Sequence, residues 1–186
     1  MKANRRIALD HIFAHEGGYA ERKEEGGGAV NMGITFNTYK AHMATQGLLN
    51  VTWEDLKKMP KSIAEAIYLK TYLQPIGFDD LPPGLDYAVL DGAILGGVSG
   101  SVKLLQISLG LTPVDGKFDP RVRWAANHRP LPVLINSYCD NRLLKYKTFK
   151  TWKTVAVKKT GKTWGEIWTD RIETVRKRAL ELAGDH

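Results

Sequence analysis

Cysteine is almost absent from this sequence, because Cys139 is the single one among 186 residues. An intrachain disulfide is therefore excluded. Cys139 lies close to Val133, Leu134, Ile135 and Tyr138, which predicts packing in a core rather than a nucleophilic role. The five histidines are not spaced as metal ligands with Cys or Asp, and no glycine-rich phosphate-binding motif occurs. We therefore expect neither a metal ion nor a nucleotide cofactor.

Long apolar segments are also missing. No stretch approaches the roughly 18 consecutive apolar residues of a membrane-spanning helix, so no transmembrane segment is expected. The first 20 residues include Lys2, Arg5, Arg6, Asp10 and Glu16. These charges exclude the uncharged apolar core of a secretory signal. The sequence therefore predicts a protein that accumulates in the cytoplasm where it is made.

A carboxylic acid stands at the end of the first predicted helix, residues 3–16. Leu9, Ile12 and Phe13 form an apolar stripe, and Glu16 falls on the same stripe. Burial and the negative end of the helix dipole both disfavour the charged form of this carboxyl group. Such surroundings suit a general acid that holds its proton near neutral pH. An exposed glutamate at a frayed helix end is the simpler alternative.

The segment that follows Glu16 is rich in glycine and charge, with no helical or strand period before Val30. Three consecutive glycines, residues 26–28, allow close backbone approach. Three further carboxylates follow within nine residues of Glu16: Glu21, Glu24 and Glu25. A turn of this kind can return a second carboxyl group across a cleft, which is the arrangement that glycoside hydrolysis needs. Composition alone favours a surface loop with solvated charges.

This part of the chain resembles the signature of glycoside hydrolase family 108 in three blocks: His15–Tyr19 (HEGGY), Gly27–Ala29 and Asn31–Thr35 (NMGIT). Enzymes of that family are peptidoglycan muramidases of the lysozyme-like superfamily and are common as phage endolysins. The resemblance implies that Glu16 is the catalytic acid. It continues more weakly through residues 66–92, and residues 103–116 and 168–172 are similar to the associated C-terminal peptidoglycan-binding region.

The loop departs from the family pattern. The family has Asn-Asp-Pro-x-Asp-Pro-Gly-Gly where this chain has ERKEEGGG at residues 21–28. Both prolines are therefore absent, Arg22 replaces the first aspartate and Glu25 replaces the second. Lysozyme-like enzymes often carry an aspartate nine residues after the catalytic glutamate. Glu25 is therefore the candidate second carboxylate, with Glu21 and Glu24 as alternatives.

The resemblance implies a lysozyme that hydrolyses the β-1,4 bond between N-acetylmuramic acid and N-acetylglucosamine, without a cofactor, and thereby lyses bacteria. Tyr19, Asn31 and Thr35 are the candidate substrate-binding residues, although Thr35 also suits a helix N-cap. A phage endolysin needs a separate holin to reach the periplasmic or cell-wall peptidoglycan. Retaining and inverting mechanisms both stay open, because the separation of the carboxyl groups decides between them. A catalytically weak peptidoglycan-binding or secretion-associated protein of the same fold is the alternative, since Arg22 and Glu25 replace the usual aspartates.

The expected fold is mainly α: the two-lobed helical fold of lysozymes, with a small β-hairpin near Val30–Ile34 in the active lobe. We expect a catalytic lobe over residues 1–84 and a helical lobe over residues 85–186, packed as one compact monomer and divided at the proline-rich turn 79–84. The helices are predicted at 3–16, 36–46, 63–73, 85–95, 100–109, 120–127, 131–147 and 165–183. The sequence also predicts a capped turn at Thr52–Asp55, a capping box at Ser62–Glu65 and an N-cap at Asp119.

Positive charge is concentrated in the last quarter of the chain. Residues 1–140 hold 15 Lys or Arg and 15 Asp or Glu, whereas residues 141–186 hold 12 and 5. Trp152 and Trp164 lie among these charges, which indicates attraction to an anionic cell envelope; a solvated helix face is the simpler alternative. Single-stranded nucleic acid would suit the same pattern. No recognition motif accompanies it and the Glu16 motif would stay unexplained, so no nucleic-acid partner is expected.

Overall fold

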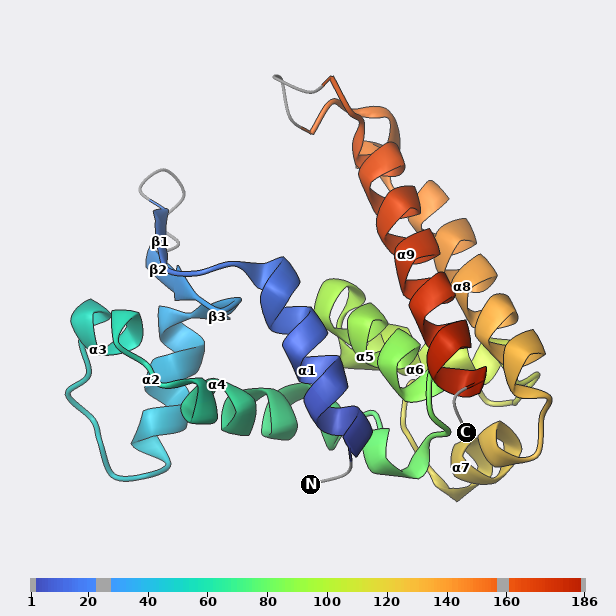
Figure 1. The fold of residues 1–186 in the computed structure, drawn as a ribbon, viewed down its shortest axis with the longest axis horizontal. Helices are drawn as coiled ribbons and strands as arrows, with labels where there is room; N and C mark the ends of the chain where they lie inside the picture. Colours follow the sequence, from blue (N-terminus) through green and yellow to red (C-terminus); the bar gives the residue numbers. More distant parts are fainter. Residues whose placement is uncertain (1–2, 23–27, 157–160, 185–186) are drawn as a thin grey trace. The chain divides into compact units, whose positions relative to one another are not determined.

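The computed structural model describes residues 3–22, 28–156 and 161–184. This part of the chain is mainly helical and has one small antiparallel sheet, as predicted for a lysozyme-like protein (Figure 1). By its internal contacts the chain divides into two compact units, Met1–Thr71 and Tyr72–His186. The predicted boundary at residues 79–84 therefore lies inside the second unit.

The first unit contains a long first helix, a sheet in the order β1-β2-β3 and three shorter helices. Ala20 of β1 lies opposite Val30 of β2, and Asn31 of β2 lies opposite Ile34 of β3, both in antiparallel register. The predicted hairpin is thus part of a three-stranded sheet. The elements are α1 (Ala3–Glu16), β1 (Ala20–Arg22), β2 (Gly28–Asn31), β3 (Ile34–Thr35), α2 (Phe36–Ala44), α3 (Trp53–Lys57) and α4 (Lys61–Tyr68), and a π-helical turn follows at Leu69–Leu73.

Two helix starts in the first unit test the capping predictions. Thr52 and Asp55 form a reciprocal capping box at α3: Thr52 N donates to Asp55 Oδ2 at 2.7 Å, and Asp55 N donates to Thr52 Oγ1 at 3.3 Å. The capping box predicted at Ser62 is wrong, because α4 begins at Lys61 after Pro60, which makes no side-chain cap. The extended backbone of Pro60 starts the helix early, so Ser62 falls inside the first turn.

The second unit contains a helix that is buried on every side. All side chains from Leu85 to Ala93 of α5 are buried, as expected for a core helix. Cys139 of α8 is buried as well, and burial raises the pKa of its thiol to about 11. The thiol is therefore protonated at neutral pH and packs in the core, as predicted. The elements are η2 (Phe78–Asp80), α5 (Leu85–Gly96), α6 (Val98–Ser108), α7 (Pro120–Asn127), α8 (Leu131–Lys147), η3 (Lys150–Lys153) and α9 (Trp164–Gly184).

A buried carboxylate joins three helices of the second unit. Asp91 of α5 forms ion pairs with Arg142 of α8 and with Arg171 of α9, whose Nε lies 2.9 Å from Asp91 Oδ1. The side chains of Arg142 and Asp91 are 0% and 1% exposed. Burial disfavours the guanidinium charge, but the Asp91 carboxylate holds the pKa of Arg142 above its ordinary value. The guanidinium charge of Arg142 therefore persists inside the core.

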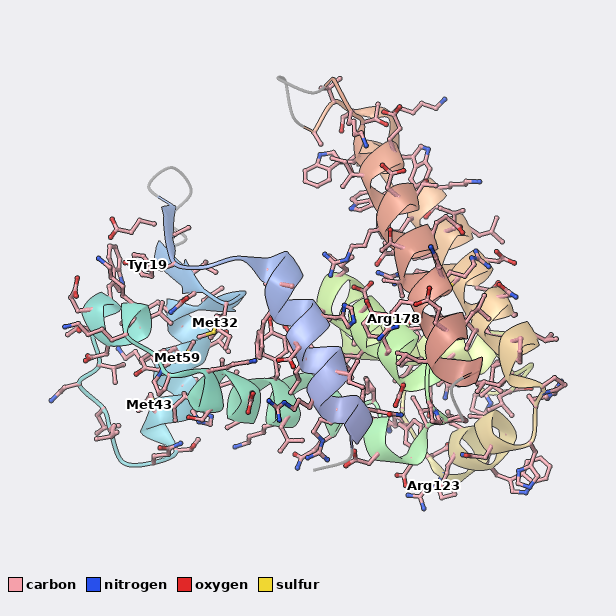
Figure 2. All side chains as sticks on the ribbon, viewed as in Figure 1. Tyr19, Met32, Met43, Met59, Arg123 and Arg178 are labelled. Atoms are coloured by element: carbon pink, nitrogen blue, oxygen red, sulfur yellow. The ribbon has the colours of Figure 1, made fainter. Side chains whose placement is uncertain are left out.

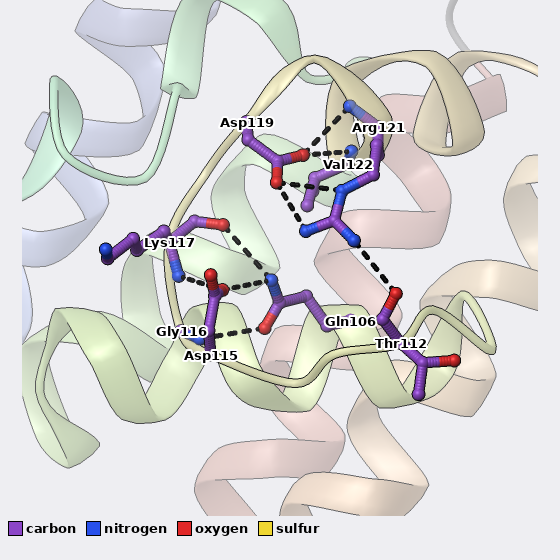
Figure 3. Close-up of polar contacts among 8 residues, drawn as sticks. All are labelled: Gln106, Thr112, Asp115, Gly116, Lys117, Asp119, Arg121 and Val122. Carbon is purple, nitrogen blue, oxygen red and sulfur yellow. Dashed lines mark hydrogen bonds and ion pairs between the residues drawn. The ribbon is translucent and has the colours of Figure 1, made fainter.

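One buried amide holds the loop between α6 and α7 (Figure 3). Gln106 Oε1 accepts a hydrogen bond from Gly116 N at 2.9 Å, and Gln106 Nε2 donates to Asp115 Oδ1 at 2.8 Å. The hydrogen bond from Gln106 lowers the pKa of the Asp115 carboxyl. This amide therefore fixes the course of the loop that leads to α7.

The start of α7 has the predicted cap. Asp119 Oδ1 accepts hydrogen bonds from Arg121 N at 2.8 Å and Val122 N at 3.1 Å, and Pro120 occupies the first helical position. The Arg121 guanidinium contacts the same carboxylate at 2.6 Å. Its hydrogen bonds lower the pKa of Asp119.

Asp119→Ala should lower the free energy of unfolding by about 1 kcal/mol, because two backbone N–H groups lose their acceptor. The pKa of Asp119 is lower in the folded chain than in the unfolded one. This contribution is therefore present above the ordinary aspartate pKa of about 4 and is lost as the pH falls through the folded value. Chemical denaturation at neutral and at acid pH measures both effects. Asp119→Asn keeps an acceptor and should lose less; an equal loss would contradict the capping role.

Candidate active site

Glu16 ends α1 in the first unit, on the predicted apolar stripe. Leu9 and Ile12 of that stripe are 2% and 0% exposed, and Glu16 is half-buried. Gly17 follows with φ of +73°, the left-handed conformation that commonly ends helices. The carboxyl group therefore stands where the core-facing stripe reaches the surface.

The carboxyl group of Glu16 packs against a glycine of the β2–β3 turn. Met32 and Gly33 have φ of 49° and 74°, as in the two-residue turn of a tight hairpin. A Cβ atom on Gly33 would lie 2.9 Å from Glu16 Oε2 and 2.6 Å from Tyr68 Oη. The backbone conformation and the closeness of these two side chains therefore both require glycine at position 33.

Tyr68 of α4 also packs against the β2–β3 turn, beside Gly33. It is 2% exposed, and its hydroxyl donates to the Met32 carbonyl at 3.1 Å. Its ring meets the Phe13 ring of α1 edge to face, with centroids 5.2 Å apart. Lys61 of α4 also forms an ion pair with Asp10 of α1. These contacts fix the end of α1, with its carboxyl group, against the β2–β3 turn and α4.

The sequence alone does not single out Tyr68. An apolar-face tyrosine in a helix is typical of a core, and Tyr68 is also part of the core of this unit. The available signal is its place in the segment 66–76, within the weaker part of the family resemblance. Its proximity to Glu16 depends on the tertiary packing of α1 and α4, which helical periodicity does not specify.

The predicted second acid, Glu25, lies outside the described residues, as do the other residues at positions 23–27, so the roles of Glu24 and Glu25 stay predictions.

Glu21 of β1 is exposed, and its Oε1 accepts a hydrogen bond from the Tyr19 hydroxyl at 3.0 Å. Partial burial and this hydrogen bond raise the pKa of Tyr19. Tyr19 also lies below Lys57 Nζ, 5.5 Å from the ring centroid, and is labelled in Figure 2. Its hydroxyl is therefore a neutral donor that is engaged by Glu21.

The other two predicted cleft residues have local structural partners. Asn31 is buried, and its Nδ2 donates to the Leu56 carbonyl at 2.8 Å, which fastens β2 to α3. Thr35 is exposed and is the N-cap of α2, where Oγ1 accepts from Thr38 N at 3.3 Å. The alternative of a helix N-cap at Thr35 is thus confirmed. An exposed hydroxyl at this position is also open to a ligand.

A hollow of about 510 Å³ lies beside Thr35, between α2 and the end of α4. Thr38 lines it, and the Thr38 hydroxyl lies 3.0 Å from that of Thr35. Asn37, His42 and Lys70 add an amide, an imidazole and an ammonium group to the lining. Hydrogen-bonding groups placed around an apolar floor are typical of sites for small polar molecules. This hollow is therefore chemically suited to a sugar.

No group of three or more His, Cys, Asp or Glu in the described part of the chain is placed to hold a metal ion. Among the helices at the described positions, none is both long and apolar enough to cross a membrane.

Comparison with known proteins places these residues in a family. The family model described as Glycosyl hydrolase 108 matches residues 9–97, a range that includes Glu16, Gly33 and Tyr68. The solved structure of SagA from Brucella abortus is 34% identical, with a TM-score of 0.77 over 98% of this chain and 97% of SagA. No curated protein matches the chain. The family match ends at residue 97, so the likeness of later residues to a peptidoglycan-binding region stays a prediction.

Proposed function

The chain belongs to the glycosyl hydrolase 108 family, and from this premise we propose that it is an N-acetylmuramidase with Glu16 as its general acid. The proposed substrate is peptidoglycan, cleaved at the β-1,4 bond between N-acetylmuramic acid and N-acetylglucosamine. The observation that supports this most is the half-buried Glu16 carboxyl group, whose Oε2 lies 2.9 Å from the position that a Cβ of Gly33 would occupy.

In this mechanism Glu16 gives its proton to the bridging oxygen as the glycosidic bond breaks. A positioned general acid contributes about 10²–10⁴-fold to the rate. Gly33 and Tyr68 act as positioning residues, because they restrict where the Glu16 carboxyl group can lie. A second carboxyl group, proposed to be that of Glu25, orients the attacking water or stabilises the oxocarbenium-like state.

The proposed glycan site includes Tyr19 and Thr35. The exposed Thr35 hydroxyl lies 3.0 Å from the hydroxyl of Thr38, which lines the hollow together with other hydrogen-bonding side chains. Asn31 is proposed to support this site without direct contact to the glycan, because its amide nitrogen donates to the Leu56 carbonyl of α3. The proposed biological result is bacterial lysis by an endolysin that reaches the wall after a holin opens the membrane.

Product analysis tests the bond that is cleaved. Purified peptidoglycan is digested, reduced with borohydride and examined by mass spectrometry. We expect new reducing ends that carry reduced N-acetylmuramic acid. New ends that carry reduced N-acetylglucosamine would contradict the bond assignment. Protein that is retained on intact, undigested sacculi would favour the catalytically weak binding protein.

Gly33→Ala should lower kcat on peptidoglycan by at least about tenfold, because displacements of about 1 Å near a reacting group are costly. The added methyl group falls 2.6 Å from Tyr68 Oη and 2.9 Å from Glu16 Oε2, so at least one of these groups must move. The measurement is the initial rate of turbidity loss with suspended cell walls.

Gly47→Ala is the matched control for the Gly33 variant. Gly47 has φ of +82°, so it carries the same backbone strain, but a Cβ there meets no atom within 4 Å. The control should lose stability through backbone strain alone and keep its activity. Equal activity losses in the two variants would remove the argument for Gly33 as a positioning residue.

A further inference from the structure

An apolar cavity of about 240 Å³ lies in the second unit, where α5, α6 and α8 come together. Apolar side chains and helix backbone make up most of its walls. They include Gly92, Gly96, Gly100, Leu104, Ile107 and Phe149. Ile107 and Phe149 are 49% and 39% exposed, so the cavity opens to the surface.

The packing of the fold does not explain why residue 100 is a glycine. At Gly92 a Cβ atom would strike the Tyr138 hydroxyl, so glycine is required there. At Gly100 a Cβ atom would meet no atom within 4 Å, and the backbone is not left-handed. Glycine in a helix is less favourable than alanine by about 0.8–1 kcal/mol. Its position in the wall supplies a reason, because a larger side chain at Gly100 would occupy the cavity.

Positive charge borders this apolar space. Lys103 of α6 and Lys145 of α8 both line the cavity and are exposed. Neither ammonium group has a carboxylate partner among the residues that the structure describes. The cavity also reaches Gly100 and Ser101 in the first turn of α6, where the helix dipole favours an anion. An apolar interior with a cationic rim matches a ligand that has a hydrocarbon part and an anionic group.

The cavity adjoins an aromatic cluster that is partly exposed at Phe149 and Trp164. Tyr146 and Phe149, which line the cavity, contact the Trp168 ring at centroid distances of 5.5 and 5.7 Å. Trp152 and Trp164 pack on the same ring at 6.1 and 5.6 Å. The rings come from the end of α8, the following turn with η3, and the start of α9. The end of α8 and the start of α9 lie side by side (Figure 1). The surface around them also holds Lys147, Lys150 and Lys153. Tryptophan together with lysine is typical of segments that sit at the interface of an anionic membrane.

We propose that the second unit binds the surface of a membrane that contains anionic phospholipid. One acyl chain enters the cavity, and the lipid phosphate lies between Lys103 and Lys145. An apolar cavity of about 150 Å³ is known to take benzene, so 240 Å³ admits a segment of one acyl chain. This binding is separate from the proposed glycosidase chemistry and does not depend on Glu16.

Co-sedimentation with vesicles tests the proposal. The wild-type protein should pellet with vesicles of phosphatidylcholine and phosphatidylglycerol and stay in solution with phosphatidylcholine alone. Gly100→Leu fills the cavity and should weaken binding at least about tenfold, because several buried CH₂ groups are displaced. Lys103→Gln combined with Lys145→Gln should weaken it as well.

Matched variants separate the cavity from general surface charge. Gly184→Leu makes the same substitution at a helical glycine of α9 that also has open surroundings, and it should bind as the wild type does. Lys40→Gln combined with Lys177→Gln removes two exposed charges elsewhere and should have a smaller effect than the Lys103 and Lys145 pair. Full vesicle binding by Gly100→Leu would overturn the proposal. The proposal would also be overturned if Gly100→Leu lost its retention on purified sacculi but still bound vesicles.

A second measurement uses the unmodified chain and covers the case in which Gly100→Leu does not fold. Phosphatidylglycerol with brominated acyl chains should quench tryptophan fluorescence, because Trp168 meets the cavity-lining rings of Tyr146 and Phe149 edge to face. Phosphatidylcholine vesicles with the same brominated chains should leave it unchanged. Binding to the phosphatidylglycerol vesicles without quenching would show adsorption by the headgroups alone and overturn the proposal.

Discussion

Glu16→Gln should abolish practical cell-wall lysis while the protein stays folded. Glutamine has nearly the same size as glutamate and fits the same space beside Gly33, but it has no proton to give to the leaving oxygen. The rate of wall digestion should therefore fall by about 10²–10⁴-fold. The measurement is the turbidity loss of chloroform-treated Gram-negative cells, with circular dichroism to verify the fold.

Glu181→Gln is the control for this experiment. Glu181 lies on α9, where it forms an exposed pair with Arg178 at 3.0 Å, and pairs of this kind contribute little to stability. The control variant should lyse cells at the wild-type rate. A Glu16→Gln protein that still clears cells at full speed would remove Glu16 from the chemistry, whatever the family membership of the chain.

Asp91→Asn should cause the largest loss of stability among single substitutions in the second unit that keep the shape of the side chain. The Arg142 guanidinium is 0% exposed, and Asp91 is its carboxylate partner. Removal of one partner from a buried ion pair typically costs about 3–5 kcal/mol, because the other charge is left uncompensated. For a chain of this length each kcal/mol lowers the Tm by about 2–4 °C. Thermal denaturation should therefore show a fall of about 10 °C.

Asp140→Asn provides the comparison. Its carboxylate pairs with Arg176 at 2.6 Å but is 63% exposed, so its loss should cost less than about 1 kcal/mol. A triple variant, Asp91→Leu with Arg142→Met and Arg171→Met, should recover most of the stability, since it removes both guanidinium partners of Asp91 and apolar replacement of a whole buried ion-pair group is often neutral. Similar Tm values for Asp91→Asn and Asp140→Asn would contradict the role assigned to the buried pair.

Helix positions in this fold follow from sequence periodicity and caps. The first helix, residues 3–16, and the helix at 131–147 have the predicted bounds, and Asp119 with Pro120 marks the start of α7. These signals are local, because an apolar stripe and a capping side chain lie within a few residues of each other. The Ser62 prediction fails for an equally local reason: the backbone of Pro60 determines where α4 begins.

Long-range partners do not follow from the same signals. The motif around Glu16 indicates the acid, but helical periodicity does not bring Tyr68 to the β2–β3 turn. Likewise, Arg142 appears in the sequence as one more basic residue of a basic helix, whereas the structure gives it a buried carboxylate 51 positions away in sequence. Tertiary contacts of this kind decide which polar side chains in an amphipathic helix face inward.

The most direct test of the central claim compares leaving groups. Glu16→Gln is assayed on peptidoglycan and on a 2,4-dinitrophenyl glycoside of the N-acetylglucosaminyl–N-acetylmuramic acid disaccharide, whose leaving group departs without a proton. If Glu16 is the general acid, the loss of about 10²–10⁴-fold on the natural bond should nearly vanish on the activated one. An equal loss on both substrates would contradict proton donation by Glu16.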